Sequence, residues 1–593
     1  MFFPLSTASL PQFLGFFTFL YVLLVILSVA VLGEIQFNPS ELVLSPNFDI
    51  NSGPQIRNYT FTVRSVHVNM LVINNQYPGP LIEVNIFTFQ RIYQRELLTP
   101  EDTISVLVKN ELNIEVSIHW HGMFQRGTPW MDGVTGVTQC AIPAGTSFRY
   151  TFTITDQFGT YWYHAHAQAL NADGIAGPLI VHSPRDPLKR DVNYNRDMIV
   201  FIADWFHDQS TAILAGQLSA AGYKNTTAAP SPNSALINGV GQFNCQYADA
   251  GDICGPNTGP LQIQVEPKQR TRLRLIQAGS HAMFRVSVDN HPLTVVEADS
   301  TGVQAPQPVH RVPRLQFHNG QRYSVILDTT SDQAGSSFFL RAAMDTDCFA
   351  WLAPGIGACI DLDPDTLSPL LSKDPETNVI GRVVFYESSF GIVMTPNPSN
   401  PQNSQALGRF FVDNTTWTTF VYKPLLQQFL SGGSQTVNSS QITALTLSTQ
   451  GTYDIVINNL DSGIDHVYHL HGVDSSIVAQ GSGQLTDSQA QKLQYRTSNP
   501  MRRDTMVVRG GSYIVGDTRS GIQSGVWILH CHISFHLAAG FAGVIVMQPS
   551  EIAKMTLPAE NQALCSAANP QNVENTTPGQ IASTQRLRAR RVR

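Results

Sequence analysis

Charged residues are scarce in this 593-residue sequence. They make up 14% of it, and 37 Lys and Arg against 44 Asp and Glu leave a net charge of −7. Nucleic acids and anionic membranes bind basic patches, for which this composition provides little material. We therefore expect no nucleic-acid partner.

The chain is too long for one hydrophobic core, which stops growing near ~250–300 residues, so three or four domains are expected.

Basic residues are absent before Arg57, and this part of the chain contains a long apolar run, FLGFFTFLYVLLVILSVAVLG, at residues 13–33. Such a run is typical of a secretory signal or of a single membrane span. Small residues near Gly33 suit cleavage, so we interpret residues 1–33 as a signal peptide, with a retained N-terminal anchor as the alternative. Both interpretations predict that the rest of the chain is exported, and it contacts a membrane only if the anchor is kept.

Cysteine is also scarce, with seven in the chain. If Cys531 is set aside, six remain that could form three disulfides in an oxidising compartment. Short separations favour two small loops and leave one long-range pair, although the connectivity stays open; the expected bonds are Cys245–Cys254, Cys348–Cys359 and Cys140–Cys565. Five Asn-X-Ser/Thr sequons agree with export and are candidate glycosylation sites at Asn58, Asn225, Asn414, Asn438 and Asn575.

Short runs that alternate apolar and polar residues recur between turn residues, as in ISVLVKN at 104–110. This pattern predicts β-sandwiches or barrels, and the fold class is all-β. Proline-rich breaks near residues 182–187 and 364–376 divide the chain into expected domains at 55–185, 195–365 and 378–555. The end of the chain, 566–593, is rich in Asn, Gln, Thr and Pro and is expected to be flexible.

Two H-x-H pairs occur in the first expected domain and again in the third. With an offset of 366, His164 and His166 align with His530 and His532; with an offset of 350, His119 and His121 align with His469 and His471. Residues i and i+2 of a strand point to one face, so each pair presents two imidazoles side by side. Eight imidazoles suit copper better than calcium, magnesium or structural zinc. The two copies are therefore predicted to enclose a copper cluster between them.

The third domain also contains three donors that the first domain lacks. His466, Cys531 and His536 replace Val116, Ala165 and Leu170 of the earlier copy. Two imidazoles and one thiolate form the ligand set of blue-copper electron-transfer sites. We predict a second copper site here, in preference to a structural cysteine that two histidines flank by coincidence.

Four motifs resemble those of the multicopper oxidases, specifically the laccase branch, and the resemblance covers nearly the whole mature chain. They are HWHG (119–122), YWYHAH (161–166), HVYHLHG (466–472) and HCHISFHLAAGF (530–541). The resemblance implies three cupredoxin-like Greek-key β-sandwich domains, secretion, and four copper ions in a monomer. It also implies an enzyme that oxidises phenols or aromatic amines one electron at a time and couples four such oxidations to the reduction of dioxygen to two waters. Synthesis of a pigment or of a phenolic metabolite is one role that such a reaction serves.

The resemblance assigns each copper ligand. The type 1 copper would bind His466, Cys531 and His536; the type 2 copper His119 and His469; the type 3 coppers His121, His164 and His532, and His166, His471 and His530. A reducing substrate bound beside His536 would give single electrons to the type 1 copper, and Cys531 would pass them through its neighbours His530 and His532 to the type 3 pair.

Three further positions bear on the mechanism. Phe541 stands where other branches carry an axial methionine, and the loss of that donor favours a high type 1 potential; the aligned Ile175 shows that packing alone could explain an apolar residue. Asp132, in PWMDG, matches an acid that helps deliver protons to the cluster, although a turn-capping aspartate is the alternative. Ser534 departs from relatives that carry an acid there, which puts the usual proton donor in doubt.

The substrate pocket has a weaker signature. His281 is the nearest polar candidate for binding a phenol beside His536, and a surface-loop histidine is its alternative. Two other functions are alternatives to a phenol oxidase. A ferroxidase would need acids around His466 and His536, where the sequence offers Asp465. A non-catalytic copper or electron-transfer protein would need only the type 1 site, and the eight further histidines argue against it.

Overall fold

The structure is a computed structural model of the whole chain, and it describes most of the region that carries the motifs. The described residues are 42–67, 70–86, 101–226, 228–249, 254, 259–304, 311–312, 314–344, 366–375, 383–397, 400–418, 423–432, 441–519, 523–567 and 584–585. No helix among them is long and apolar enough to cross a membrane. The apolar run at 13–33, Cys348, Cys359 and the sequons at Asn438 and Asn575 lie outside the described residues.

The first domain pairs two sheets. One has the order β2-β1-β4-β6 and the other β3-β8-β7-β5. Their strands are β1 (Ile56–His67), β2 (Met70–Ile73), β3 (Ile82–Asn85), β4 (Thr103–Asn110), β5 (Ile118–His121), β6 (Ser147–Thr153), β7 (Gly159–Ala165) and β8 (Ala176–His182). The short 3-10 helix η2 (Pro129–Met131) leads into Asp132.

The second domain pairs a large sheet, in the order β11-β10-β9-β12-β18-β14-β15-β20 with β16 beside β14, and a small one, β17-β13-β19. The strands are β9 (Arg196–Trp205), β10 (Ser234–Ile237), β11 (Val240–Gly241), β12 (Arg270–Gln277), β13 (Phe284–Val288), β14 (Leu293–Ala298), β15 (Thr301–Gln304), β16 (Arg311–Val312), β17 (Leu315–Phe317), β18 (Arg322–Asp328), β19 (Leu340–Met344) and β20 (Ser368–Pro369). The helices are α2 (Ser210–Gln217) and η3 (Cys245–Tyr247).

The third domain pairs a sheet in the order β22-β21-β24-β29-β26-β27, with β32 beside β21, and a sheet β23-β31-β30-β25-β28. The strands are β21 (Val383–Asn397), β22 (Asn400–Val412), β23 (Ala444–Leu447), β24 (Thr452–Asn459), β25 (His466–Leu470), β26 (Ser475–Ser482), β27 (Arg502–Arg503), β28 (Thr505–Val508), β29 (Ser512–Arg519), β30 (Gly525–Cys531), β31 (Ala542–Met547) and β32 (Thr584–Gln585). The helices are α3 (Leu425–Gly432), α4 (Asp487–Ala490), α5 (Ser534–Ala538), α6 (Pro549–Ile552) and α7 (Ala559–Ala567).

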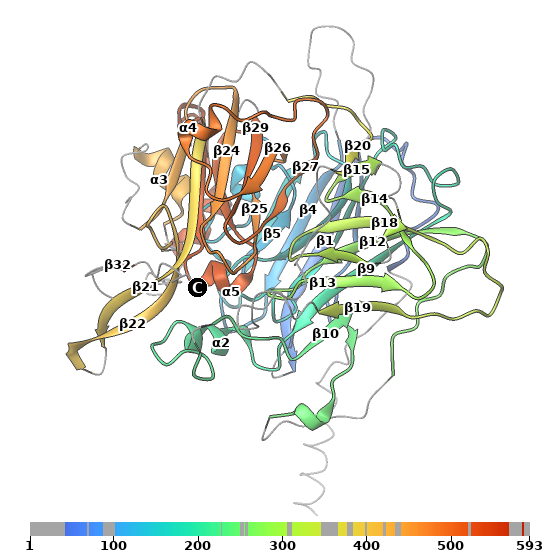
Figure 1. Cartoon of the computed structure of the whole chain (residues 1–593), viewed down its shortest axis with the longest axis horizontal. Coiled ribbons are helices and arrows are strands. Elements are labelled where there is room, and N and C mark those ends of the chain that lie inside the picture. Colours follow the sequence, from blue (N-terminus) through green and yellow to red (C-terminus); the bar gives the residue numbers. More distant parts are fainter. Residues whose placement is uncertain are drawn as a thin grey trace, which may run out of the picture.

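One sheet of each domain contains an equivalent parallel strand pair, and the all-β prediction is confirmed. Each domain contains a parallel pair of strands within an otherwise mainly antiparallel sheet: β1 with β4, β9 with β12, and β21 with β24. In Figure 1 the second domain (green) and the third (yellow to red) lie on opposite sides of the view, and α5 lies close to α2 of the second domain.

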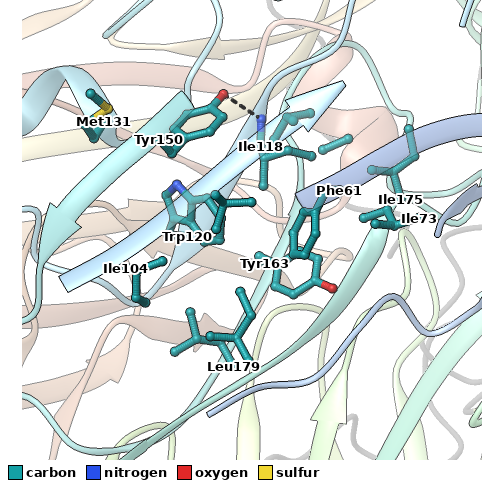
Figure 2. Packing of buried hydrophobic residues seen from close by; sticks show 14 of the residues in the cluster. Phe61, Ile73, Ile104, Ile118, Trp120, Met131, Tyr150, Tyr163, Ile175 and Leu179 are labelled. Carbon is teal, nitrogen blue, oxygen red and sulfur yellow. Dashed lines mark hydrogen bonds between the residues drawn. The ribbon is translucent and has the colours of Figure 1, made fainter. Parts of the chain in front are cut away.

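The core of the first domain explains the orientation of its first histidine pair (Figure 2). Trp120, between His119 and His121 on β5, packs with its ring centroid 5.5 Å from that of Tyr150. The Tyr150 hydroxyl accepts a hydrogen bond from the Ile118 amide at 3.1 Å. Because neighbouring residues of a strand face opposite sides, the burial of Trp120 in this core directs both histidines to the other face of the sheet.

Two disulfides occur in the described structure, and both agree with the expected pairs. Cys140–Cys565 ties α7, near the end of the chain, to the first domain, and Cys245–Cys254 closes a short loop of the second domain. Cys531 is buried and free. The three sequon asparagines within the described residues, Asn58, Asn225 and Asn414, are exposed.

Candidate metal centres

A thiol and two imidazoles converge in the third domain. The Cys531 Sγ, at the end of β30, lies 3.8 Å from His466 Nδ1, at the start of β25, and 3.7 Å from His536 Nδ1, in α5. All three side chains are buried, and their ligand atoms lie within 4.8 Å of one another. The short helix α5 turns the chain back so that His536 faces the cysteine five residues earlier. This donor set suits copper.

Aromatic rings close this site on one side. The Phe541 ring lies 4.8 Å from that of His466 and stacks on Phe410 at 4.9 Å, while Phe410 lies 4.4 Å from His536. Phe541 is fully buried and offers no donor atom. Its counterpart in the first domain, Ile175, belongs to the ordinary core drawn in Figure 2.

Burial keeps the Cys531 thiol and the His536 imidazole of this site neutral in the absence of a metal ion. It raises the pKa of the Cys531 thiol to about 12 and holds the pKa of His536 well below its usual range. A metal ion binds the thiolate, so copper binding would displace the thiol proton.

The eight remaining histidines come together between the first and third domains. The strand registers are equivalent in the two copies: His119 pairs with His164 across β5 and β7, and His469 pairs with His530 across β25 and β30. Rings from different domains are in contact, with His121 stacked on His469 at 3.7 Å and His119 stacked on His471 at 3.8 Å. The duplicated pairs thus form one cluster.

The hydrogen bonds of these rings point to a cation. His471 donates from Nδ1 to the Asp132 carboxylate at 2.9 Å, and His530 donates from Nδ1 to the Cys531 carbonyl at 2.9 Å. In a neutral imidazole a proton on Nδ1 leaves a lone pair on Nε2. The two Nε2 atoms of His471 and His530 face each other at 3.1 Å, an arrangement that a metal ion between or beside them would stabilise.

Further unpaired nitrogens agree with this interpretation. Within the described structure, four buried Nε2 atoms have no hydrogen-bond partner; they belong to His119, His164, His166 and His469. Three of these rings donate from Nδ1 to backbone carbonyls: His119 to Asp132 at 2.8 Å, His164 to Ala165 at 2.9 Å, and His469 to Asp504 at 2.9 Å. The unpaired lone pairs are those that metal ligation would use.

The potential metal-binding groups overlap with one another. His166, His471 and His530 form one trio, His119 and His469 share another with His471, and His119, His121 and His164 form a third. His121 Nδ1 lies 3.2 Å from His532 Nε2, and the rings of His164 and His532 are 5.4 Å apart.

The protonation states suit metal binding. Burial, reinforced by the neighbouring imidazoles, holds the pKa well below its usual range in His121, His164, His166, His469, His471 and His532. Burial also lowers the pKa of His530 to about 4. At neutral pH these seven rings are uncharged, which is the form that ligates a metal.

Three carboxylates lie next to the histidines, and two of them, Asp461 and Asp504, were not candidates from the sequence. Asp132 is fully buried against His119 and His471, next to the cluster. Asp461 Oδ2 lies 3.0 Å from the outer nitrogen, Nε2, of His466. Asp504 Oδ1 lies 3.3 Å from His121 Nε2. Asp465, the acid considered for iron binding, instead accepts a hydrogen bond from the Gly510 amide.

The remaining sequence candidates lie where the second domain meets α5. The His281 ring is 6.1 Å from that of His536, and burial lowers the pKa of His281 to about 3. Asp204 fixes the loop that carries His281 by accepting backbone hydrogen bonds at 2.6–2.8 Å from residues 280–282. The side-chain amide of Asn171, in the first domain, donates hydrogen bonds to the hydroxyls of Ser280, in the second domain, and Ser534, in the third. This contact connects the three domains.

A buried cysteine–histidine site beside an eight-histidine cluster, on three paired sheets, defines a copper-dependent oxidoreductase. Comparison with known proteins agrees: models of the multicopper oxidase family match residues 55–186, 196–353 and 398–551. The chain belongs to the multicopper oxidase family.

Its relatives include several fungal laccases. Laccase-1 of Cryptococcus neoformans var. neoformans is 38% identical over 90% of this chain and 87% of its own length. Laccase-5 of Trametes villosa is 33% identical over 79% of this chain and 83% of its own length. The crystal structure of the laccase from Botrytis aclada has a TM-score of 0.70 at 25% identity, covering 88% of this chain and 93% of that one.

Proposed function

We propose that this chain is a laccase-type oxidase, which takes single electrons from phenols or aromatic amines and uses four of them to reduce dioxygen to two waters. The observation that carries the proposal is the adjacency of the two centres. Cys531, in the aromatic-lined site, is flanked in sequence by His530 and His532, both in the eight-histidine cluster. The laccases of Cryptococcus neoformans and Trametes villosa support this choice among the oxidases of the family.

The proposal includes four coppers per chain. The type 1 ion would bind His466, Cys531 and His536; the type 2 ion His119 and His469; the type 3 ions His121, His164 and His532, and His166, His471 and His530. Copper bound in these places supplies the redox chemistry, accepting single electrons at the first site and reducing dioxygen at the cluster.

The protein's own residues orient ligands, exclude water and hold protons. Asp132 accepts a hydrogen bond from His471 and touches His119, so it fixes two cluster rings and is the acid best placed to hold a proton beside them. Ser534 cannot replace it as an acid, because a hydroxyl does not ionise near neutral pH.

The reducing substrate would bind beside His536, which is 6% exposed. His281, 8% exposed and 6.1 Å away ring to ring, would accept a hydrogen bond from the phenol, because its lowered pKa keeps the imidazole neutral.

Oxygen uptake by the copper-loaded protein tests the function. We expect uptake with a methoxyphenol, at four electrons per dioxygen, and little with ascorbate or Fe(II). A protein that binds four coppers yet consumes no oxygen with any of these donors would overturn the enzyme proposal.

One observation favours a second candidate, a ferroxidase. Asp461 pairs with the outer nitrogen of His466, and its side chain is 11% exposed, so a carboxylate lies at the outer edge of the type 1 site. A relative named iron transport multicopper oxidase fetC, from Epichloe festucae, is 28% identical over 86% of this chain. Two results together would establish this candidate in place of the laccase. Oxygen uptake would be faster with Fe(II) than with the phenol, and Asp461→Ala would lose the uptake with Fe(II) but keep that with the phenol.

We also propose a secreted monomer, cleaved near Gly33, with domains at 55–185, 195–365 and 378–555. The exposed sequons Asn58, Asn225 and Asn414 are accessible to glycosylation, which agrees with this route. N-terminal sequencing of the mature protein distinguishes a cleaved signal from a retained anchor.

A further inference from the structure

A turn of the second domain reaches the histidine cluster, although that domain supplies none of the expected ligands. The turn follows β17 and leads into β18 at residues 318–322. Gly320 adopts a φ of +82°, and a Cβ placed on it would lie 2.8 Å from His532 Cδ2 and 3.0 Å from His121 Cε1. The backbone of the turn therefore packs directly against one ring of each flanking domain, where only glycine fits.

Arg322, at the end of this turn, joins all three domains. It is fully buried and donates two hydrogen bonds to Asp504 of the third domain, at 2.7 Å and 2.6 Å. Its Nε donates to the Thr160 carbonyl of the first domain at 3.0 Å, and its Nη1 also donates to the Gly320 carbonyl at 3.1 Å. A bidentate arginine–carboxylate ion pair of this kind fixes both partners in position and orientation.

The residues that Arg322 holds contact two ligand rings. The Thr505 hydroxyl donates to Asp504 Oδ1 at 2.7 Å, accepts from His121 Nε2 at 3.1 Å, and lies 3.2 Å from His469 Nδ1. The backbone carbonyl of Asp504 accepts from His469 Nδ1 at 2.9 Å. His121 belongs to the first domain and His469 to the third, so these two residues fix one ring from each copy.

The glycine of the HWHG motif gives independent support for this arrangement. Gly122 has a φ of +86°, and a Cβ on it would lie 3.0 Å from Arg322 Nη2 and 3.1 Å from Asp504 Oδ2. A side chain at 122 would therefore collide with the ion pair. The residue after the second histidine is confined to glycine partly because this pair occupies the space beside it.

We propose that Arg322 is a positioning residue for the trinuclear copper cluster. Through Asp504 and Thr505 it sets the ring planes of His121 and His469 and their protonated nitrogens, so that His121 presents Nδ1 and His469 presents Nε2 to the metal. The second domain thus serves as a template that aligns the ligands of the other two. This inference rests on the proposed function, because it takes these histidines as copper ligands.

The test compares holoprotein with Arg322→Met, which keeps length and burial but removes the donors. Loss of a residue that orients metal ligands typically costs roughly 10–100-fold in metal affinity or activity. We expect that fall in copper affinity at the cluster, measured against a graded chelator, together with an altered type 2 electron paramagnetic resonance spectrum. The type 1 absorbance and potential should not change, and kcat should fall while KM for the phenol does not.

Arg274→Met is the matched control. Arg274 is equally buried and makes a bidentate ion pair with Asp197 at 2.8 Å and 2.9 Å. It also reaches Thr160 of the first domain, at 2.9 Å, but contacts no cluster histidine. We expect this variant to lose thermal stability while its type 2 spectrum stays that of the wild type.

A type 2 spectrum and copper affinity unchanged from wild type in Arg322→Met would overturn the proposal. If that variant does not accumulate as folded protein, Thr505→Val removes only the hydroxyl beside His121 and His469, and an unchanged spectrum there has the same consequence. A wild-type protein without a type 2 signal would instead contradict the proposed function, which separates the two failures.

Discussion

Two side chains would act in opposite directions on a copper bound at the proposed type 1 site. Phe541 places an aromatic ring where a donor could stand, which would favour Cu(I) and raise the potential. Asp461 accepts a hydrogen bond from His466, which would make the imidazole a stronger donor, favour Cu(II) and lower the potential. Single substitutions at these two positions should therefore shift the potential in opposite directions.

Replacing Phe541 by Met tests the first of these effects. A thioether facing His466 and Cys531 would add an axial donor and stabilise Cu(II). We expect the type 1 potential of Phe541→Met to fall and oxidation of electron-poor phenols to slow most. A redox titration of the type 1 absorbance measures this; a potential equal to that of the wild type would show that Phe541 is ordinary core.

Asp461→Asn tests the effect of Asp461, and it should change the type 1 potential in the opposite direction. The amide is nearly the same size but uncharged, so the His466 ring becomes a weaker donor and the potential should rise. Asp465→Asn is the matched control, because Asp465 adjoins His466 in sequence but bonds Gly510 instead. Equal potentials in the two variants would contradict a specific role for Asp461.

At the scale of elements, the turn that follows α5 allows residues 531–541, which include Cys531 and His536, to fold back on themselves. Gly540 has a φ of +103°, and a Cβ there would lie 2.0 Å from Thr416 Oγ1. Forcing a side chain into this backbone region costs on the order of 1–3 kcal/mol, before any clash is counted. We expect Gly540→Ala to lower the free energy of unfolding by at least that amount and to weaken the type 1 absorbance, because Phe541 and His536 flank the turn.

The duplication supplies the control for this prediction. Gly174 is the counterpart of Gly540 in the first domain, with a φ of +114° and a Cβ position 2.5 Å from the Leu71 carbonyl oxygen. Gly174→Ala should destabilise the protein comparably, as urea or thermal unfolding measures. Its type 1 absorbance should remain intact, and a loss as large as that in Gly540→Ala would show that the effect is only global destabilisation.

At the scale of the whole molecule, the sequence predicted what depends on local spacing. The H-x-H pairs follow from strand alternation, and the repeat identified which copy gained His466, Cys531 and His536. Contacts between distant residues left no such signal. Arg322 and Asp504 are 182 residues apart, and nothing in the chain around either one marks it as a partner of the other. Asp461 was missed because a loop, not a strand period, returns it to His466.

A contact between the first two domains links stability to pH. Asp173, on the first domain, accepts hydrogen bonds at 2.7 Å from both the amide and the hydroxyl of Ser210, at the start of α2. Burial raises the pKa of Asp173 from 3.8 to about 6. Between these values the folded protein keeps a proton that the unfolded chain has lost, so this group makes the folded state less stable as the pH rises from about 4 to about 6, and not further above it.

Asp173→Asn should remove this pH dependence, because the amide does not titrate. The difference in unfolding free energy between the variant and the wild type should therefore shift in favour of the variant from pH 4 to pH 6 and stay constant above. Denaturant unfolding of the copper-free protein across this range measures it, which keeps ligand titration at the metal sites the same in both proteins. A difference that does not vary with pH would show that the Asp173 carboxyl ionises alike in the folded and unfolded chains.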